Sequence, residues 1–175
     1  FLEYGRPTEG LFLFACTMFL IFNLISGWFF LGDMGSYGIG AIILCYGLNG
    51  VAVGDFSAAF MATLLAYPCL DFVVSIVRRL RVGRSPFSAD NDHLHNRLHW
   101  QIKQLVKSKV LANSLTGLTI SGCTAGLTLY AYSLNWLPIT SNQWIFLFII
   151  EVFLYGVGFK LTQQDRGTTQ YSEPV

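Results

Sequence analysis

A glycine-flanked aspartate marks the first place in the sequence where chemistry is expected. Asp33 lies in the run Gly32-Asp-Met-Gly-Ser36, between two long apolar segments. Glycines let the backbone turn tightly and leave the carboxylate accessible. Such a carboxylate can share Mg²⁺ with substrate phosphates, because Mg²⁺ takes one or two protein carboxylates and completes its octahedron with phosphate and water oxygens. The alternative is that Asp33 caps the helix that follows it.

A basic, histidine-bearing loop is the second such place. Residues 78–110 carry 8 of the 11 Lys and Arg residues and contain the motif Asp90-Asn-Asp-His-Leu-His-Asn96. An amphipathic helix is predicted to follow, with its apolar face formed by Leu94, Leu98, Ile102 and Leu105. If Asp90 caps this helix, His93 lies in its first turn, where free N–H groups and the helix dipole favour an anion such as a diphosphate.

Two other interpretations of this loop stay open. The arginines could bind phosphate groups bidentately, but a basic cluster directly after a membrane span is also a common topological anchor. A zinc site is the second alternative, with Asp90, Asp92, His93, His95 and His99 as its candidate ligands. His93 and His95 would not easily bind one ion, because residues two apart on a helix do not face each other, whereas His95 and His99 could.

Membrane helices are predicted to position both places. The chain is 53% hydrophobic and 12% charged, with a mean hydropathy of +0.51, whereas soluble domains carry about a quarter charged residues. Its uncharged stretches exceed the roughly 20 residues that cross a bilayer, and alternating strand patterns are absent. We therefore predict an all-α, multi-span transmembrane helix bundle that forms one membrane domain. Its five spans are expected at 11–30, 36–53, 56–77, 111–134 and 143–161.

Five spans place the 31–35 connection, the 78–110 loop and the C-terminal tail on one side. That side holds 10 of the 11 positive charges and leaves Arg6 on the other. The positive-inside rule assigns the basic side to the cytoplasm. We therefore expect a multi-pass protein of the inner membrane, with Asp33 and the segment 90–96 converging on one cytoplasmic cleft.

Two ionisable residues fall inside predicted spans. Asp71 and Glu151 are costly there and are expected to face the bundle or pair with another charge. Arg78, seven residues after Asp71, is a plausible structural partner, whereas Glu151 has no assignable one. Pro68 is expected to kink the third span. If both carboxylates instead line a pathway, the protein is a transporter or channel subunit, and a noncatalytic membrane scaffold is a third alternative.

The two loops together resemble the polyprenyl-phosphate N-acetylhexosamine-1-phosphate transferases. The resemblance rests on Phe22-Asn23, Phe30-Leu-Gly-Asp-Met-Gly-Ser36, Pro68-x-x-Asp71, Arg78-Arg79, Ser85-Pro-Phe87 and Asp90-x-x-His93-x-His95, in that order. Two departures from the family pattern are visible. The usual His-x-His-His reads His93-Leu-His-Asn96, and the Arg that often follows the loop aspartate is Asn91.

The resemblance implies a Mg²⁺-dependent enzyme, with Mn²⁺ as an alternative ion. Such enzymes join a UDP-N-acetylhexosamine to a polyprenyl phosphate and release UMP, the first membrane step of cell-envelope polysaccharide synthesis. Asp33 would be the catalytic, metal-binding residue. Residues expected to bind substrate are Gly32, Gly35, Ser36, Arg79, Arg84, Asp90, His93, His95 and Asn96. The membrane is a further expected partner, a homodimer is left open, and no nucleic acid is expected.

The resemblance also concerns what lies outside these 175 residues. The family's paired-aspartate motif would precede residue 1, so the chain corresponds to the C-terminal half of such an enzyme. We therefore expect this segment alone to be inactive.

Overall fold

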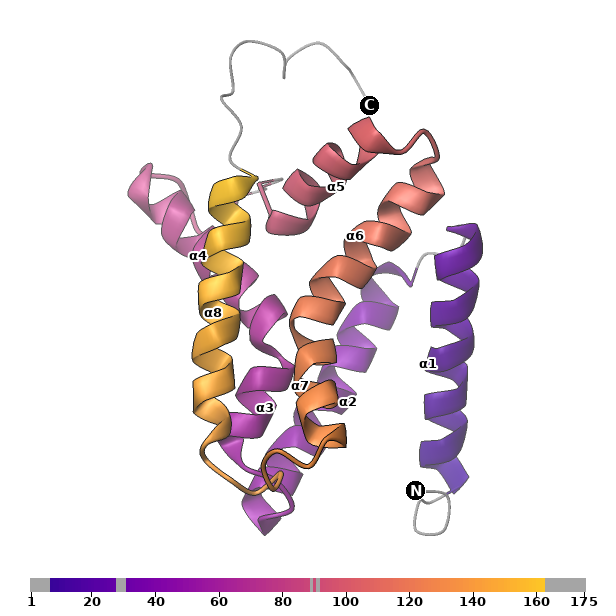
Figure 1. The fold of residues 1–175 in the computed structure, drawn as a ribbon, viewed down its shortest axis with the longest axis vertical. Coiled ribbons are helices and arrows are strands. Elements are labelled where there is room, and N and C mark those ends of the chain that lie inside the picture. The colour runs from indigo at the N-terminus through magenta and orange to yellow at the C-terminus, as the bar shows by residue number, and fades with distance from the viewer. Residues whose placement is uncertain (1–6, 28–30, 89, 91, 163–175) are drawn as a thin grey trace.

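The computed structural model describes residues 7–27, 31–88, 90 and 92–162, and those residues form eight helices and no strand. The helices are α1 (Pro7–Ser26), α2 (Gly32–Val53), α3 (Ala58–Leu64), α4 (Ala66–Arg81), α5 (Leu94–Leu105), α6 (Lys109–Cys123), α7 (Ala125–Ser133) and α8 (Trp144–Leu161). Figure 1 shows most of them running along the long axis, with α5 lying across one end. The predicted all-α bundle is thereby confirmed.

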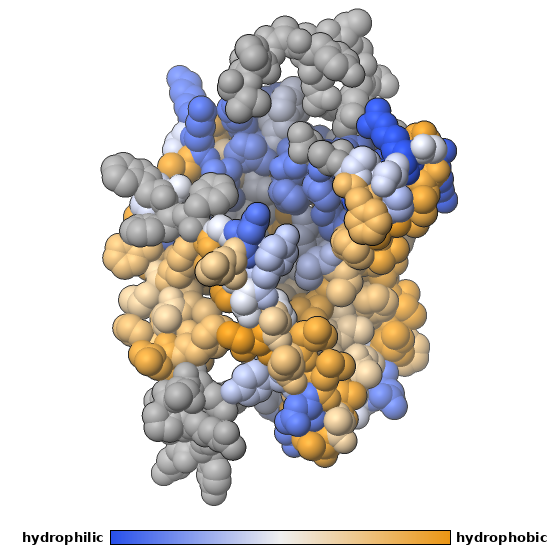
Figure 2. Space-filling model, turned by 180° about the vertical axis from the view of Figure 1, so that it is seen from behind, coloured by the Kyte–Doolittle hydropathy of each residue, from blue (hydrophilic) through white to orange (hydrophobic). Residues whose placement is uncertain are grey.

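Two helices, α2 and α8, are long and apolar enough to cross a membrane. The pairs α3–α4 and α6–α7 also pass if each counts as one bent span, and α1 contributes a shorter apolar stretch over Gly10–Ser26. Length and composition thus support two to four spans, whereas the sequence predicted five. On the face shown in Figure 2, hydrophobic residues cover both sides of the middle of the molecule, as expected of a surface that faces lipid.

Both bends have local causes. The α3–α4 pair turns by 74° at Leu65, and Pro68 has no N–H to donate to the carbonyl of Leu64 one turn earlier. The α6–α7 pair turns by 50° at Thr124, whose hydroxyl donates to the Ile120 carbonyl at 2.8 Å. Threonine hydroxyls bonded to the preceding turn often bend helices. The first bend was expected from Pro68, and the second was not.

Helix α2 begins four residues earlier than predicted. Gly32 takes a positive φ of 66° and starts the helix, so Asp33 lies in its first turn rather than in a connecting loop. Leu31 occupies the capping position, and no side chain caps this terminus. The alternative role of Asp33 as a helix cap is therefore wrong. Helix α4 extends four residues beyond the predicted 77, which places Arg78 and Arg79 in its last turn.

Positive charge gathers at one end of the bundle. The ends of α4 and α8, the start of α6 and all of α5 lie in the upper half of Figure 1, together with the start of α2. The described Lys and Arg residues fall on these segments or on the loops next to them: Arg78, Arg79, Arg81, Arg84, Arg97, Lys103, Lys107, Lys109 and Lys160. Arg6 and Arg166 lie outside the described residues. Figure 2 shows the hydrophilic surface at the same end, and its cytoplasmic location stays a prediction.

Hydroxyl groups join the helices of the interior. Thr63 of α3 donates to the Trp144 carbonyl at the start of α8 (3.2 Å), and Ser57 donates to the Ser141 carbonyl (2.8 Å). Glu151, fully buried in α8, accepts a hydrogen bond from Thr128 of α7 at 2.9 Å. Glu151 therefore has a structural partner that the sequence did not reveal.

Candidate active site

One buried carboxylate holds the histidine-bearing loop against the bundle. Asp71, in the second turn of α4, is 9% exposed. Its Oδ2 lies 2.7 Å from His93 Nδ1, and its Oδ1 accepts from the Leu94 N–H (3.1 Å) and from the Tyr155 hydroxyl of α8 (2.9 Å). The expected pair between Asp71 and Arg78 is wrong, because Asp71 faces His93 and Tyr155 instead. Three elements of the fold thus meet at one carboxylate.

The start of α5 differs from its predicted form for the same reason. The helix begins at Leu94, so His93 is the extended residue before its first turn. The carboxylate that accepts from the first helical N–H belongs to Asp71 of α4, and Asp90 does not cap the helix. A negative charge near a helix N-terminus already satisfies the dipole. An incoming diphosphate would therefore compete with Asp71 for this terminus.

Asp90 is engaged in an ion pair inside the loop. Its carboxylate accepts from the Arg78 guanidinium, from the Ser75 hydroxyl (2.8 Å) and from the Asp92 N–H (3.0 Å). Burial opposes ionisation of Asp90, but these three donors outweigh it and hold the pKa of its carboxyl well below the usual range. The structure therefore gives Asp90, predicted to bind substrate, a role in ordering the loop.

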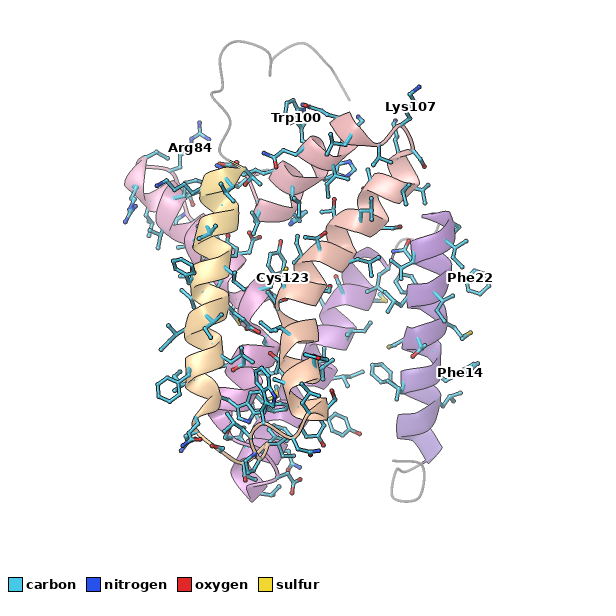
Figure 3. The ribbon with its side chains drawn as sticks, in the orientation of Figure 1. Phe14, Phe22, Arg84, Trp100, Lys107 and Cys123 are labelled. Carbon is cyan, nitrogen blue, oxygen red and sulfur yellow. The ribbon has the colours of Figure 1, made fainter. Side chains whose placement is uncertain are left out.

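Arg79 also serves the fold. Its guanidinium donates to the carbonyls of Pro86 and Ser88, the latter at 2.8 Å, and to the carbonyl and hydroxyl of Ser75 at 3.2 and 3.0 Å. These bonds tie the turn that follows α4 back onto the helix. Arg84, in that turn, is exposed, and its side chain has no ion pair within the described part of the chain. Figure 3 shows it at the outer edge of the charged end.

Arg97 of α5 completes the internal pairing of the loop. Its guanidinium donates twice to the Asp92 carboxylate, at 2.7 Å each, and stacks over the Phe159 ring of α8 at 3.9 Å from the centroid. Cation–π contact and a bidentate ion pair at one side chain fix its orientation. Arg78, Arg79 and Arg97 are therefore used to order the loop, which leaves Arg81 and Arg84 as the exposed arginines of the described residues.

A pocket of about 370 Å³ opens between α4, α5 and α6. It is lined by Tyr67, His95, Asn96, His99, Asn113, Thr116, Gly117, Ile120 and Ser121. The Tyr67 hydroxyl lies 3.0 Å from His95 Nδ1, and the His93 and His95 rings stack with centroids 5.4 Å apart. His99 Nδ1 is buried without a hydrogen-bond partner among the described residues. The pocket thus presents imidazole, amide and hydroxyl groups at the charged end of the bundle.

The electrostatics of the pocket favour a neutral His95. Partial removal from solvent lowers the pKa of His95 below its usual value, Asp71 opposes this shift, and His93 and His99 add to it. No group of three or more His, Cys, Asp or Glu side chains is arranged to hold a metal ion in the described ranges. The zinc interpretation therefore receives no support, and His93 and His95 stack rather than converge on an ion.

Asp33 lies at the same end of the bundle as α5 but outside this pocket. Its side chain is exposed, and its carbonyl accepts from the Ser36 hydroxyl at 3.0 Å. A side chain at Gly35 would meet Leu31 at 2.8 Å, which favours glycine there. The start of α2 shares the upper half of Figure 1 with α5, whereas the pocket is lined by α4, α5 and α6. A cleft shared by Asp33 and segment 90–96 stays a prediction.

The chain is similar in sequence to proteins that are named as polyprenyl-phosphate sugar-phosphate transferases. It is 35% identical over 97 residues to decaprenyl-phosphate N-acetylglucosaminephosphotransferase of Mycobacterium tuberculosis, covering 48% of this chain and 24% of the relative. It is 30% identical over 138 residues to undecaprenyl-phosphate alpha-N-acetylglucosaminyl 1-phosphate transferase of Salmonella typhi, covering 75% and 34%. The enzyme of that second name from Thermotoga maritima is 34% identical over 83 residues, covering 47% and 28%.

The chain is thus an all-helical bundle with apolar spans whose sequence is similar to that of polyprenyl-phosphate phosphotransferases. The resemblance drawn from the motifs is confirmed, and the chain is a relative of the polyprenyl-phosphate N-acetylglucosamine-1-phosphate transferases. It spans about a quarter to a third of the length of these relatives. No family model and no solved structure matches the chain significantly.

Proposed function

We propose that the protein containing this chain transfers an N-acetylhexosamine 1-phosphate from a UDP-sugar to polyprenyl phosphate and releases UMP. The relatives' names supply the lipid acceptor and the transferred group. The structural observation that carries the proposal is the histidine-bearing segment, which α4 and α8 hold beside a polar pocket at the charged end of the bundle. Phosphoryl transfer needs mainly positioning and charge neutralisation, and these residue types supply both.

The pocket suits the sugar part of the donor. Its volume of about 370 Å³ falls within the range of small-molecule sites, roughly 300–1,000 Å³. A neutral His95, the Asn96 amide and the Asn113 amide offer hydrogen bonds to hydroxyl and acetamido groups without a net charge. His93, which stacks on His95, would lie beside the diphosphate.

We assign the phosphate of the polyprenyl acceptor to the exposed face of α4, away from the pocket. Helix α4 exposes the apolar residues Phe72, Val77 and Leu80, at 63%, 40% and 55%, and Arg84 follows in the next turn. A lipid tail can lie along such a face while a guanidinium meets the phosphate that it carries.

Asp33 suits a Mg²⁺ ion that is shared with substrate phosphates better than an ion whose ligands all come from the protein. It offers a single exposed carboxylate at the end of a span, and Mg²⁺ accepts one or two carboxylates when phosphate and water oxygens complete its shell. When bound, Mg²⁺ or Mn²⁺ would neutralise charge on the donor diphosphate. Gly32, Gly35 and Ser36 would shape the backbone around Asp33. The positive-inside rule supports a cytoplasmic location for this end, and the proposed function would set the protein in the inner membrane.

The transporter alternative has less support. Asp71 and Glu151, which would line a pathway, are each buried and hydrogen-bonded by side chains of neighbouring helices. Intramembrane carboxyls are costly unless they find partners within the bundle, and both of these do so.

The direct test uses the full-length protein in lipid nanodiscs. Polyprenyl phosphate and Mg²⁺ are supplied with either UDP-N-acetylglucosamine or UDP-N-acetylgalactosamine, and UMP is quantified by chromatography. We expect UMP release that requires the lipid phosphate and stops with EDTA. The 175-residue chain alone is expected to release none. UMP release that does not need the lipid would contradict the proposed acceptor, and no release with either sugar would contradict the proposed function.

Alanine substitutions at Arg79 and Arg84 are expected to have different effects, the first on stability and the second on substrate binding. Arg79→Ala removes donors to the Pro86 and Ser88 carbonyls, so it should lower the unfolding free energy by about 1–3 kcal/mol. Arg84→Ala should leave stability within about 0.5 kcal/mol, as for most exposed positions. It should raise the KM for polyprenyl phosphate about 10-fold, the loss of one charge-assisted contact. Thermal unfolding and steady-state kinetics measure both, and an unchanged KM in Arg84→Ala would refute its assignment.

A further inference from the structure

Among the carboxylates of the described residues, Asp71 stands apart because it contacts the loop histidine His93 directly. Both of its oxygens accept hydrogen bonds, from a ring nitrogen, a backbone N–H and a phenol. Burying an ionised carboxylate is costly, and three donors offset that cost. Such an arrangement exceeds what a helix cap requires, since a cap needs the Leu94 N–H alone.

The contact with His93 determines which ring nitrogen carries a proton. An ionised carboxylate can only accept, so the 2.7 Å contact requires hydrogen on Nδ1. In the neutral ring this leaves Nε2 as the acceptor, and in the imidazolium it leaves Nε2 as a donor. In either state Nε2 is the ring nitrogen available to a ligand. The His93 side chain is 26% exposed, so a ligand can reach it.

The surroundings fix the ring as well as its proton. His93 stacks on His95 at an interplanar angle of 12°, and Tyr155 of α8 holds the second oxygen of Asp71. Because the Leu94 N–H donates to that same oxygen, rotation of the Asp71 carboxylate would break several bonds together. Asp71 therefore couples the start of α5 to the orientation of the imidazole.

We propose that Asp71 is a positioning residue that keeps the proton of His93 on Nδ1 and presents Nε2 to the phosphate-bearing substrate. The inference rests on the proposed function, because it gives His93 a substrate to contact. Asp71 itself touches no substrate in this scheme. It acts through His93, as the carboxylate behind a functional histidine does in other enzymes.

The test replaces the carboxylate by an amide of the same shape. In Asp71→Asn the Oδ1 can still accept from Leu94 and Tyr155, but the amide NH₂ donates toward Nδ1 and favours hydrogen on Nε2. Glu151→Gln is the matched control, since it makes the same change at a buried carboxyl of the bundle that bonds Thr128. Both variants are made in the full-length protein, and ¹⁵N-histidine NMR in nanodiscs reports the tautomer of each histidine.

We expect the His93 signal of the wild type to show hydrogen on Nδ1, and Asp71→Asn alone to move it to Nε2. The kcat for UMP release should fall about 100-fold or more in Asp71→Asn with a smaller change in KM, because a carboxylate-to-amide change behind a catalytic histidine costs up to about 10⁴. Asp71→Glu, which keeps a carboxylate, should restore part of kcat. Glu151→Gln should change neither the tautomer nor kcat.

The outcomes separate this inference from the proposed function. An Asp71→Asn variant that folds and keeps the wild-type tautomer would overturn the positioning role. An equal loss of kcat in Asp71→Asn and Glu151→Gln would overturn it too, because the effect would then be general to the bundle. If the wild type releases no UMP, the proposed function fails, while the tautomer measurement still decides whether Asp71 fixes the His93 proton.

Discussion

Replacing Asp33 by Asn in the full-length protein is expected to lower Mg²⁺-dependent UMP release by about 10³-fold. The amide keeps the shape of the side chain but loses the charge that would hold the ion, and charge stabilisation by a bound metal is worth several kcal/mol, about tenfold in rate for each 1.4 kcal/mol. Asp33 is exposed in the first turn of α2, so the substitution should leave the fold intact. Steady-state UMP release across a Mg²⁺ titration measures the loss.

Asp55 provides the control for this substitution. It is also exposed, and it follows the opposite end of the same helix, just after Gly54. Asp55→Asn therefore makes the same chemical change on the other side of the bundle and should keep wild-type turnover. Comparable losses in the two variants would mean that the assignment of the active end is wrong. Full turnover in Asp33→Asn would contradict the metal-binding role directly.

The architecture could be predicted because charge is excluded from long segments of the chain. Uncharged stretches such as 34–54 leave little choice other than a membrane helix, and the basic segments then indicate which ends lie together. Pro68 also predicted a bend, because the missing N–H is a property of that residue alone. Thr124 did not, because the same hydroxyl-to-carbonyl bond is made by Thr17 and Thr116 inside helices that continue unbroken, so a threonine alone does not mark a bend.

The centre of the candidate site was harder to predict because its contacts span distant parts of the sequence. A local rule favoured Asp90 as the cap of α5, yet Asp71, on another helix, holds Leu94. The cost of an intramembrane carboxylate correctly marked Asp71 as a residue that needs a partner. The prediction that Arg78 is this partner failed because seven helical residues separate Asp71 from Arg78 by about 10 Å along the axis. The folded loop brings His93 closer.

Substitution of Asp90 is also expected to have a large effect, on the stability of the histidine-bearing loop. Asp90→Ala removes the acceptor shared by the Arg78 guanidinium and the Ser75 hydroxyl, and both ion-pair side chains are largely buried, at 25% and 13% exposed. Removing Asp90 leaves the largely buried Arg78 with a longer ion pair to Asp92, at 3.4 Å, so its charge is less well compensated. We expect the free energy of opening of the loop to fall by about 2 kcal/mol. This corresponds to about 30-fold less hydrogen-exchange protection in the segment around residues 92–99.

A double-mutant cycle and a pH series identify the cause of that loss. Arg78→Met combined with Asp90→Ala should cost less than the sum of the single variants, because the two side chains form one pair, and additive costs would contradict the pairing. The pKa of Asp90 is lowered in the folded protein, so its contribution to stability is fully present above the unfolded value of about 3.9. It declines step by step as the pH falls from there toward the lower folded pKa. The difference in protection between the wild type and Asp90→Ala, corrected for intrinsic exchange, should therefore begin to shrink as the pH falls below about 4 and should keep shrinking at lower pH. A difference that persists undiminished at acidic pH would show that the ionised carboxylate is not what orders the loop.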